Sequence, residues 1–359
     1  MYANVATING ERLTVLTTGR NGYGVFANAA AGSISLRDST VTTLGDYGNG
    51  LYVTNGTLLS EQNDVSTSGI GANAVYAYGA TGNISVTGGT LTTTGANAAG
   101  ILASTGGRVT ADNLTINSSG AGLSATGASR IDATNLIVNT GSGSSAIAAA
   151  AGATIAGTSI QGQVADAGNL VAFDGTATSA NSVTLVDSAL SVDGSSAIGI
   201  NSINGINQLS LTNSQLSAAD GSAITLQNGS TLNLTLDGSA LAGVTLLDAT
   251  ATGTSAQISA ANGSVLQGDI SVDPAAAANS SLALDNSQWS GSASGLQALT
   301  LENGSQWNMA DNSSLSSLTL NDSTLNFDHS NGRSTTLTVN GDFAGTGGTL
   351  VMNTVLAGG

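Results

Sequence analysis

The sequence predicts an all-β fold, a parallel β-helix in which each coil of the chain stacks on the coil before it. A hydrophobic residue that follows a bend rich in Gly, Ala and Asn recurs along the chain at Val25, Leu51, Val75, Ile101, Leu123, Ile147, Val171, Ile198 and Ile224. Between these positions, hydrophobic and polar residues alternate over three to five residues at a time, which indicates short strands. Helical spacing is absent, and the density of Gly and Thr opposes helix.

Each coil of about 25 residues is expected to contain three strands, because a fixed period of this length is typical of a repeat fold. The first strand begins at the recurring hydrophobic residue. The second strand follows a turn that contains Gly, as at Ile34 and Leu36. The third strand follows an Asx-Ser or Asx-Gly step and centres on Val41, Val65, Leu91, Leu114, Leu136, Ile160, Leu190 and Leu216.

Roughly 13 to 14 such coils, stacked about 4.8 Å apart, would make a rod about 65 Å long. Toward the C-terminus the coils are expected to shorten to about 19 residues, because Leu299, Leu318 and Leu337 follow one another at that interval. A propeller blade needs about 40 to 45 residues, and a leucine-rich repeat needs its own leucine signature, so neither fits. The calcium-binding nonapeptide is also absent.

The composition limits the classes of function. Charged residues make up 8% of the chain, Lys and Cys are absent, and the net charge is −16. Nucleic acid is an unsuitable partner, because binding its phosphates requires cations. The apolar runs are too short to span a bilayer, and no signal peptide is recognisable. The charge is uneven: residues 1–130 hold six acids and five Arg, whereas residues 131–332 hold fifteen acids and no Arg.

The C-terminal stretch "LTVNGDFAGTGGTLVMNTVLAGG", Leu337 to Gly359, resembles the end of pertactin-like autotransporter passenger domains, the autochaperone region. The matching elements are the run from Leu337 to Phe343, Gly345, the run from Gly347 to Leu350, and Asn353-Thr354. The resemblance implies a right-handed β-helix that is exported to the surface of a Gram-negative bacterium. It also implies a partner, the passenger's own outer-membrane β-barrel, which this sequence does not contain.

On this basis we expect one continuous solenoid in two parts. Residues 1–336 would form the passenger stalk and its adhesive region, and residues 337–359 would begin the autochaperone-like segment.

Enzyme chemistry is not expected. Glycan-cleaving β-helices need paired carboxylates, often with a Lys or Arg, and the central coils have no such cation. The single histidine, His329, lies in no recognisable nucleophile motif. We therefore expect no catalytic residue, cofactor or metal.

An Asx-rich column is predicted to run along the rod at one corner of the coils, as in "TLVDSALSVDG". Asn, Asp and Gly tolerate left-handed backbone, so turn formation alone explains their recurrence. Many members are nevertheless Asp, although stacked carboxylates repel. The column is therefore either a structural corner or an acidic binding ridge, and its candidate binding residues are Asp38, Asp64, Asp112, Asn135, Asp187, Asn213, Asp237, Asn262 and Asp285.

A second column is aromatic. Val25, Leu51 and Val75 should point inward, so the residues that follow them should point outward. These residues and one neighbour are the candidates: Phe26, Tyr52, Tyr76 and Tyr78. Tyr and Arg are enriched in binding hot spots, but stacked aromatic side chains also stabilise a sheet on their own.

The sequence thus predicts a non-enzymatic surface adhesin that acts by repeated contacts along a rod. Its predicted partners are a host matrix protein or glycan, or another copy of itself, as in aggregation and biofilm formation. A glycan-cleaving enzyme and an inert stalk are the alternatives.

Overall fold

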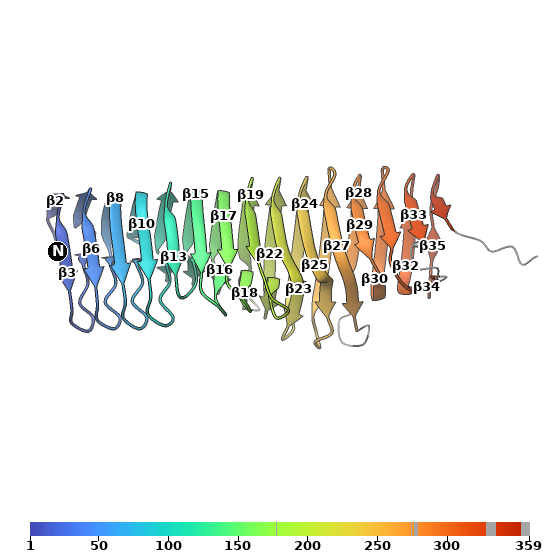
Figure 1. The fold of residues 1–359 in the computed structure, drawn as a ribbon, viewed down its shortest axis with the longest axis horizontal. Coiled ribbons are helices and arrows are strands. Elements are labelled where there is room, and N and C mark those ends of the chain that lie inside the picture. Colours follow the sequence, from blue (N-terminus) through green and yellow to red (C-terminus); the bar gives the residue numbers. More distant parts are fainter. Residues whose placement is uncertain (177, 274, 276–278, 328–334, 353–359) are drawn as a thin grey trace, which may run out of the picture.

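The computed structural model is a β-helix of about 14 turns. It describes residues 1–176, 178–273, 275, 279–327 and 335–352. All pairings between the strands of these residues are parallel, apart from two isolated bridges, and no helix occurs among them. Figure 1 shows a straight rod with the first and last turns at opposite ends. The parallel β-helix predicted from the repeat is confirmed.

Each turn contributes strands to three parallel sheets, which the chain visits in the same order. The first sheet holds β1 (Tyr2–Ala3), β4 (Val25–Ala27), β7 (Leu51–Val53), β9 (Val75–Tyr78), β11 (Ile101–Ser104), β14 (Leu123–Thr126), β16 (Ser145–Ala150), β18 (Asn169–Asp174), β21 (Ile198–Ile203) and β34 (Leu337–Val339). The second sheet holds β2 (Thr7–Glu11), β5 (Ser33–Arg37), β12 (Arg108–Asp112), β19 (Asn181–Val186), β22 (Ile206–Thr212), β24 (Thr231–Asp237), β26 (Ser255–Ala261), β28 (Ser281–Asp285) and β35 (Phe343–Ala344). The third sheet holds β3 (Thr14–Thr17), β6 (Thr40–Thr43), β13 (Thr115–Ser118), β20 (Ala189–Val192), β29 (Gln288–Gly291), β31 (Gln306–Met309), β33 (Thr324–Phe327) and β36 (Thr349–Val351).

Nine longer strands continue around a corner and belong to two sheets. Four join the second sheet to the third: β8 (Gly56–Thr67), β10 (Gly82–Thr93), β15 (Arg130–Thr140) and β17 (Thr154–Val164). Three join the third sheet to the first: β23 (Gln215–Gln227), β25 (Ala240–Ala249) and β27 (Val265–Val272). Two join the first sheet to the second: β30 (Ala293–Glu302) and β32 (Ser313–Leu320).

The core is a set of inward columns that run the length of the rod. Alternate residues of a strand face opposite sides, so about one residue in two is buried against the other sheets in the strands between the two ends of the rod. In the second sheet this column contains Ile34, Leu58, Ile84, Val109, Ile131, Ile155, Val183, Leu209, Leu234, Ile258, Leu282, Leu299 and Leu318, all buried. Each such side chain contributes roughly 1.5 to 3 kcal/mol through burial.

Threonine hydroxyls hold the bends that lead from the third sheet to the first in the N-terminal turns. The last threonine of each third-sheet strand donates a hydrogen bond to a carbonyl five residues later. Thr17 bonds to Gly22 at 2.6 Å and Thr93 to Ala98 at 2.8 Å, and Thr43 and Thr67 make the equivalent contacts. These bends therefore repeat one shape from turn to turn.

The C-terminal turns shorten as predicted, but Leu337 has a different place. Leu282 pairs with Leu299 and Leu299 with Leu318, steps of 17 and 19 residues. Leu318 then pairs with Phe343, not with Leu337, which lies in β34 of the first sheet opposite Ser313. The prediction for Leu337 was wrong because the spacing of leucines does not show which sheet a leucine belongs to.

Candidate functional site

The predicted Asx column follows the corner between the second and third sheets, where the backbone turns through a left-handed residue. Five of its nine members occupy this corner position, with positive φ: Asp38 (49°), Asn135 (53°), Asp187 (50°), Asn213 (47°) and Asn262 (57°). In neighbouring turns the same position is taken by other residues, such as Gly88, Asn113 and Gly238. The interpretation of "TLVDSALSVDG" as a structural corner is therefore confirmed for Asp187.

The other four predicted members lie beside the corner. Asp112, Asp237 and Asp285 each end a strand of the second sheet, one position before the left-handed residue. Asp64 lies after the corner, in the third sheet, between Thr40 and Thr90. The single column thus becomes three adjacent columns. The sequence shows one column because residue type alone cannot distinguish an Asp-Asn step from an Asn-Asp step.

Several of these carboxylates accept hydrogen bonds from adjacent residues. The amide nitrogen of Asn262 donates to Asp237 at 2.6 Å, and that of Asn303 donates to Asp285 at 2.7 Å. Asp64 accepts from the backbone N–H of Thr90 at 3.1 Å. Amide donors of the next turn thus offset part of the repulsion between stacked carboxylates. Within the described residues, the exposed carboxylates of Asp38 and Asp187 accept no such bond.

Sequence reasoning missed a buried serine ladder directly behind the corner. From one turn to the next, the backbone N–H of each serine donates to the hydroxyl oxygen of the following serine at 3.0 to 3.2 Å. The hydroxyl itself donates to a backbone carbonyl of its own turn, as from Ser188 to Val186 at 2.8 Å. The ladder contains Ser188, Ser214, Ser239, Ser264, Ser287, Ser305 and Ser323, all buried.

The ladder explains why a serine follows the Asx residue in the recurring Asx-Ser step. The residue after the corner points inward, so its own N–H needs a partner close to the axis of the rod. A hydroxyl both accepts and donates, so one serine satisfies two backbone groups. The recurrence of Ser after Asx was the available signal.

The aromatic column has the register that the sequence predicted. Phe26 pairs with Tyr52 and Tyr52 with Tyr76, all three half-buried on the outside of the first sheet. The rings of Phe26 and Tyr52 stack at 4.9 Å and 8°, and those of Tyr52 and Tyr76 at 5.0 Å and 18°. Tyr78 meets Tyr76 edge-on at 6.2 Å. Because the ring faces cover one another, the column offers mainly ring edges to solvent, and the Tyr76 hydroxyl lies 2.9 Å from that of Ser104.

Neighbouring aromatic residues extend this cluster. Tyr2 adds a further ring, 5.3 Å from Phe26. Tyr23, from the adjacent bend, lies 4.6 Å from Tyr52. Burial, and then the nearby tyrosines, raise the pKa of Tyr52 to about 12. Tyr47 packs against an arginine instead, with the guanidinium carbon of Arg20 5.5 Å from the centre of its ring.

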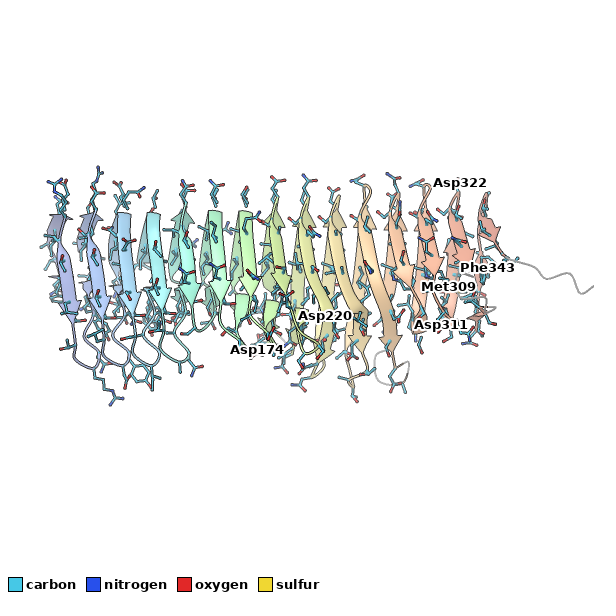
Figure 2. All side chains as sticks on the ribbon, viewed as in Figure 1. Asp174, Asp220, Met309, Asp311, Asp322 and Phe343 are labelled. Atoms are coloured by element: carbon cyan, nitrogen blue, oxygen red, sulfur yellow. The ribbon has the colours of Figure 1, made fainter. Side chains whose placement is uncertain are left out.

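The acidic side chains labelled in Figure 2 lie at both long edges of the rod. Asp322, a corner residue with φ of 45°, lies at one edge, whereas Asp174, Asp220 and Asp311 lie along the opposite edge. The described residues contain no group of three or more His, Asp or Glu that could hold a metal ion. Among the described residues there is no helix that could cross a membrane. His329 lies outside the described residues.

Shallow grooves lie on the described surface of the rod. Four grooves have volumes of 270 to 440 Å³, and none of the four is lined by two carboxylates. The largest lies on the third sheet and is lined by uncharged side chains, including Ile137, Asn139, Gln161 and Gln163. Such grooves suit surface recognition more than enclosed chemistry.

Residues 313–359 match the autochaperone domain type 1 family. This stretch is similar to an autochaperone domain, which is consistent with the C-terminal segment of an autotransporter passenger domain. The autochaperone segment, as residues 313–359 are called below, starts with β32 and includes β33 to β36. It begins before Leu337, and Asn353-Thr354 lie outside the described residues. No curated protein matches the chain.

The match and the β-helix together support an autotransporter passenger domain, and the family implies a secreted passenger at the cell surface. The division of the chain at residue 337 stays a prediction. The binding roles of the two columns likewise stay predictions.

Proposed function

We propose that this passenger domain is a non-enzymatic adhesin. It attaches the bacterium to a host matrix protein or glycan, or to another copy of the same chain, and so promotes aggregation or biofilm formation. The observation that carries the proposal is the repetition of outward side chains at the same position of successive turns. Many weak contacts on one rigid rod add to firm attachment, provided that they engage together.

Two surfaces are proposed to make these contacts. One is the acidic corner, where Asp38 and Asp187 are exposed and can accept hydrogen bonds from a partner. The other is the aromatic cluster, whose half-buried rings present their edges to solvent. They lie on different sides of the coil, so each can be tested separately. The acidic edges favour a protein partner over a sulfated polysaccharide, which they would repel.

The four grooves support a binding role over catalysis. A glycosidase needs two carboxyl groups about 5 to 10 Å apart around the scissile bond. Asp132 and Asp64 are the carboxylates that line these grooves, and each lines a different one. Glycan cleavage therefore remains the less favoured alternative, beside an inert stalk.

An array of matrix proteins and glycans, combined with sedimentation of the same protein, tests the proposal. We expect binding to at least one ligand class, or dimers that increase with concentration. Asp38→Asn with Asp187→Asn removes two charges but keeps residues that tolerate the left-handed corner. Weaker binding by this variant would identify the acidic corner as the contact surface. Tyr52→Phe with Tyr76→Phe removes hydroxyls but keeps the stacked rings. A blank array together with a strictly monomeric rod would contradict the proposal.

A further inference from the structure

Arg108 differs from the other arginines of the described chain. Three of the five form ion pairs: Arg12 with Glu11, Arg37 with Glu61, and Arg130 with Asp132. The Arg20 guanidinium lies over the ring of Tyr47. Arg108 is exposed and has no ion pair within the described residues. A free guanidinium is notable in a protein with a net charge of −16.

Arg108 lines a groove of 270 Å³ on the outer face of the second sheet. Four successive turns form it, through strands β8, β10, β12 and β15. Two outward columns supply its polar side chains: Thr57, Asn83 and Arg108 in one, Ser85, Thr110 and Asp132 in the other. Leu59, which is 41% exposed, closes the end of the second column. Ser85 and Thr110 are shorter than Leu59 and Arg108, and this difference in length hollows the surface.

The neighbouring ion pair leaves the positive charge of Arg108 unopposed. Arg130 is the register partner of Arg108 on the next turn. Its Nε and Nη2 donate to the two carboxylate oxygens of Asp132 at 2.7 and 2.5 Å. This hydrogen bonding raises the pKa of Arg130. Asp132 is thus neutralised by Arg130 and is held in one orientation, although its oxygens retain lone pairs for further donors.

We propose that this groove binds an acidic sugar through its carboxylate. The carboxylate pairs with the fork of the Arg108 guanidinium, which matches it in geometry. Sugar hydroxyls bond to Asn83, Ser85 and Thr110, and a C–H face of the ring packs on Leu59. The inference deepens the proposed adhesive function and rests on it only in taking the ligand to be a surface glycan.

A sugar fits this site better than an acidic peptide. Peptides bind sheets by pairing with a free edge, but β8, β10 and β12 are each already paired with strands on both sides. The groove therefore offers side chains and no backbone edge. Its volume is close to the lower limit for small-molecule sites.

Calorimetry with tri-galacturonate and sialyllactose tests the inference on the full chain. We expect at least one of these acidic sugars to bind, and its neutral counterpart, the galacturonate methyl ester or lactose, to bind about tenfold more weakly or worse. Arg108→Gln should lower the affinity for the acidic sugar by a similar factor. Arg12→Gln removes the same charge elsewhere and should leave binding unchanged. Because Arg108 is exposed, far-UV circular dichroism should show the same fold in both variants.

Three results would overturn the inference: neither acidic sugar binds, Arg108→Gln binds like the wild type, or hexaglutamate binds as tightly as the sugars. If these results occur while the protein still attaches to an array ligand, the proposed adhesive function stands without this site.

Discussion

At the scale of single residues, the recurring Asx-Ser step combines two structural roles. The Asx residue takes the left-handed corner, as Asp187 does with φ of 50°. The serine behind it, Ser188, is buried and links the turns on either side. Neither role requires a negative charge, because Asn and Gly fill the same corner elsewhere. The exposed carboxylates of Asp38 and Asp187 are therefore the members of the column that structure alone does not explain.

Ser188→Ala is expected to lower the free energy of unfolding by about 1 to 3 kcal/mol. The substitution leaves the buried N–H of Ile160 and the carbonyl of Val186 without their hydroxyl partner. Chemical unfolding followed by circular dichroism measures the change. Ser191→Ala, three residues later and exposed, is the matched control and should stay within about 0.5 kcal/mol of the wild type. Equal effects of the two substitutions would rule out a stabilising ladder.

The raised pKa of Tyr52 predicts a loss of stability in alkali. The unfolded chain releases this proton near pH 10, whereas the folded chain holds it until about pH 12. Stability from this group is therefore complete below pH 10 and is lost as the pH rises from 10 through 12. Urea unfolding at pH 9 and pH 11 should show a smaller loss for Tyr52→Phe than for the wild type. Identical losses would contradict the burial of this hydroxyl.

At the scale of elements, a pair of buried tryptophans lies directly before the autochaperone segment. Trp289 on β29 and Trp307 on β31 stack at 4.9 Å and 7° inside the third sheet. Their indole nitrogens donate to the carbonyls of Gly268 and Gly291, both at 2.9 Å. Trp307 also pairs with Leu325 on β33, within the autochaperone segment. The pair thus connects that segment to the preceding turns.

Trp307→Ala is expected to destabilise the C-terminal turns by roughly 3 to 5 kcal/mol, because it removes a large buried side chain and leaves a cavity. In a solenoid such a loss acts mainly on neighbouring turns. Urea unfolding followed by the fluorescence of Trp289 would measure it locally. Val351→Ala, at an exposed position of the same region, is the control. A change below 1 kcal/mol for Trp307→Ala would show that the pair does not stabilise this end.

The period, the strands and the aromatic register could be predicted from the sequence because each rests on alternation within one strand. The corners could not. In three middle turns, Leu114, Leu136 and Ile160 occupy the position directly behind the corner that serine fills elsewhere, and Ile116 and Val138 centre two of the third-sheet strands instead. The recurring hydrophobic position falls on Ile198 in the sequence, but Ile200 is the residue that pairs with the buried Val171. A shift of two residues preserves alternation, so only pairing with the neighbouring turn fixes the register.

At the scale of the whole molecule, the rod separates its chemistry along its length. The aromatic cluster and all five described arginines lie within the first 130 residues, whereas residues 131–332 carry fifteen acids without an arginine. The autochaperone segment lies at the other end. A rigid rod with this arrangement presents the aromatic and arginine-bearing surfaces far from that segment, and the acidic edges in between.

Adhesion itself is the most direct test of this account. Beads coated with the purified chain would be counted on surfaces of immobilised matrix proteins and glycans, and their clustering would be followed in suspension. We expect wild-type beads to attach or cluster. Beads that carry Asp38→Asn, Asp187→Asn, Tyr52→Phe and Tyr76→Phe together should do so far less, because repeated contacts act in concert. Wild-type beads that behave like uncoated beads in both assays would contradict the adhesive function.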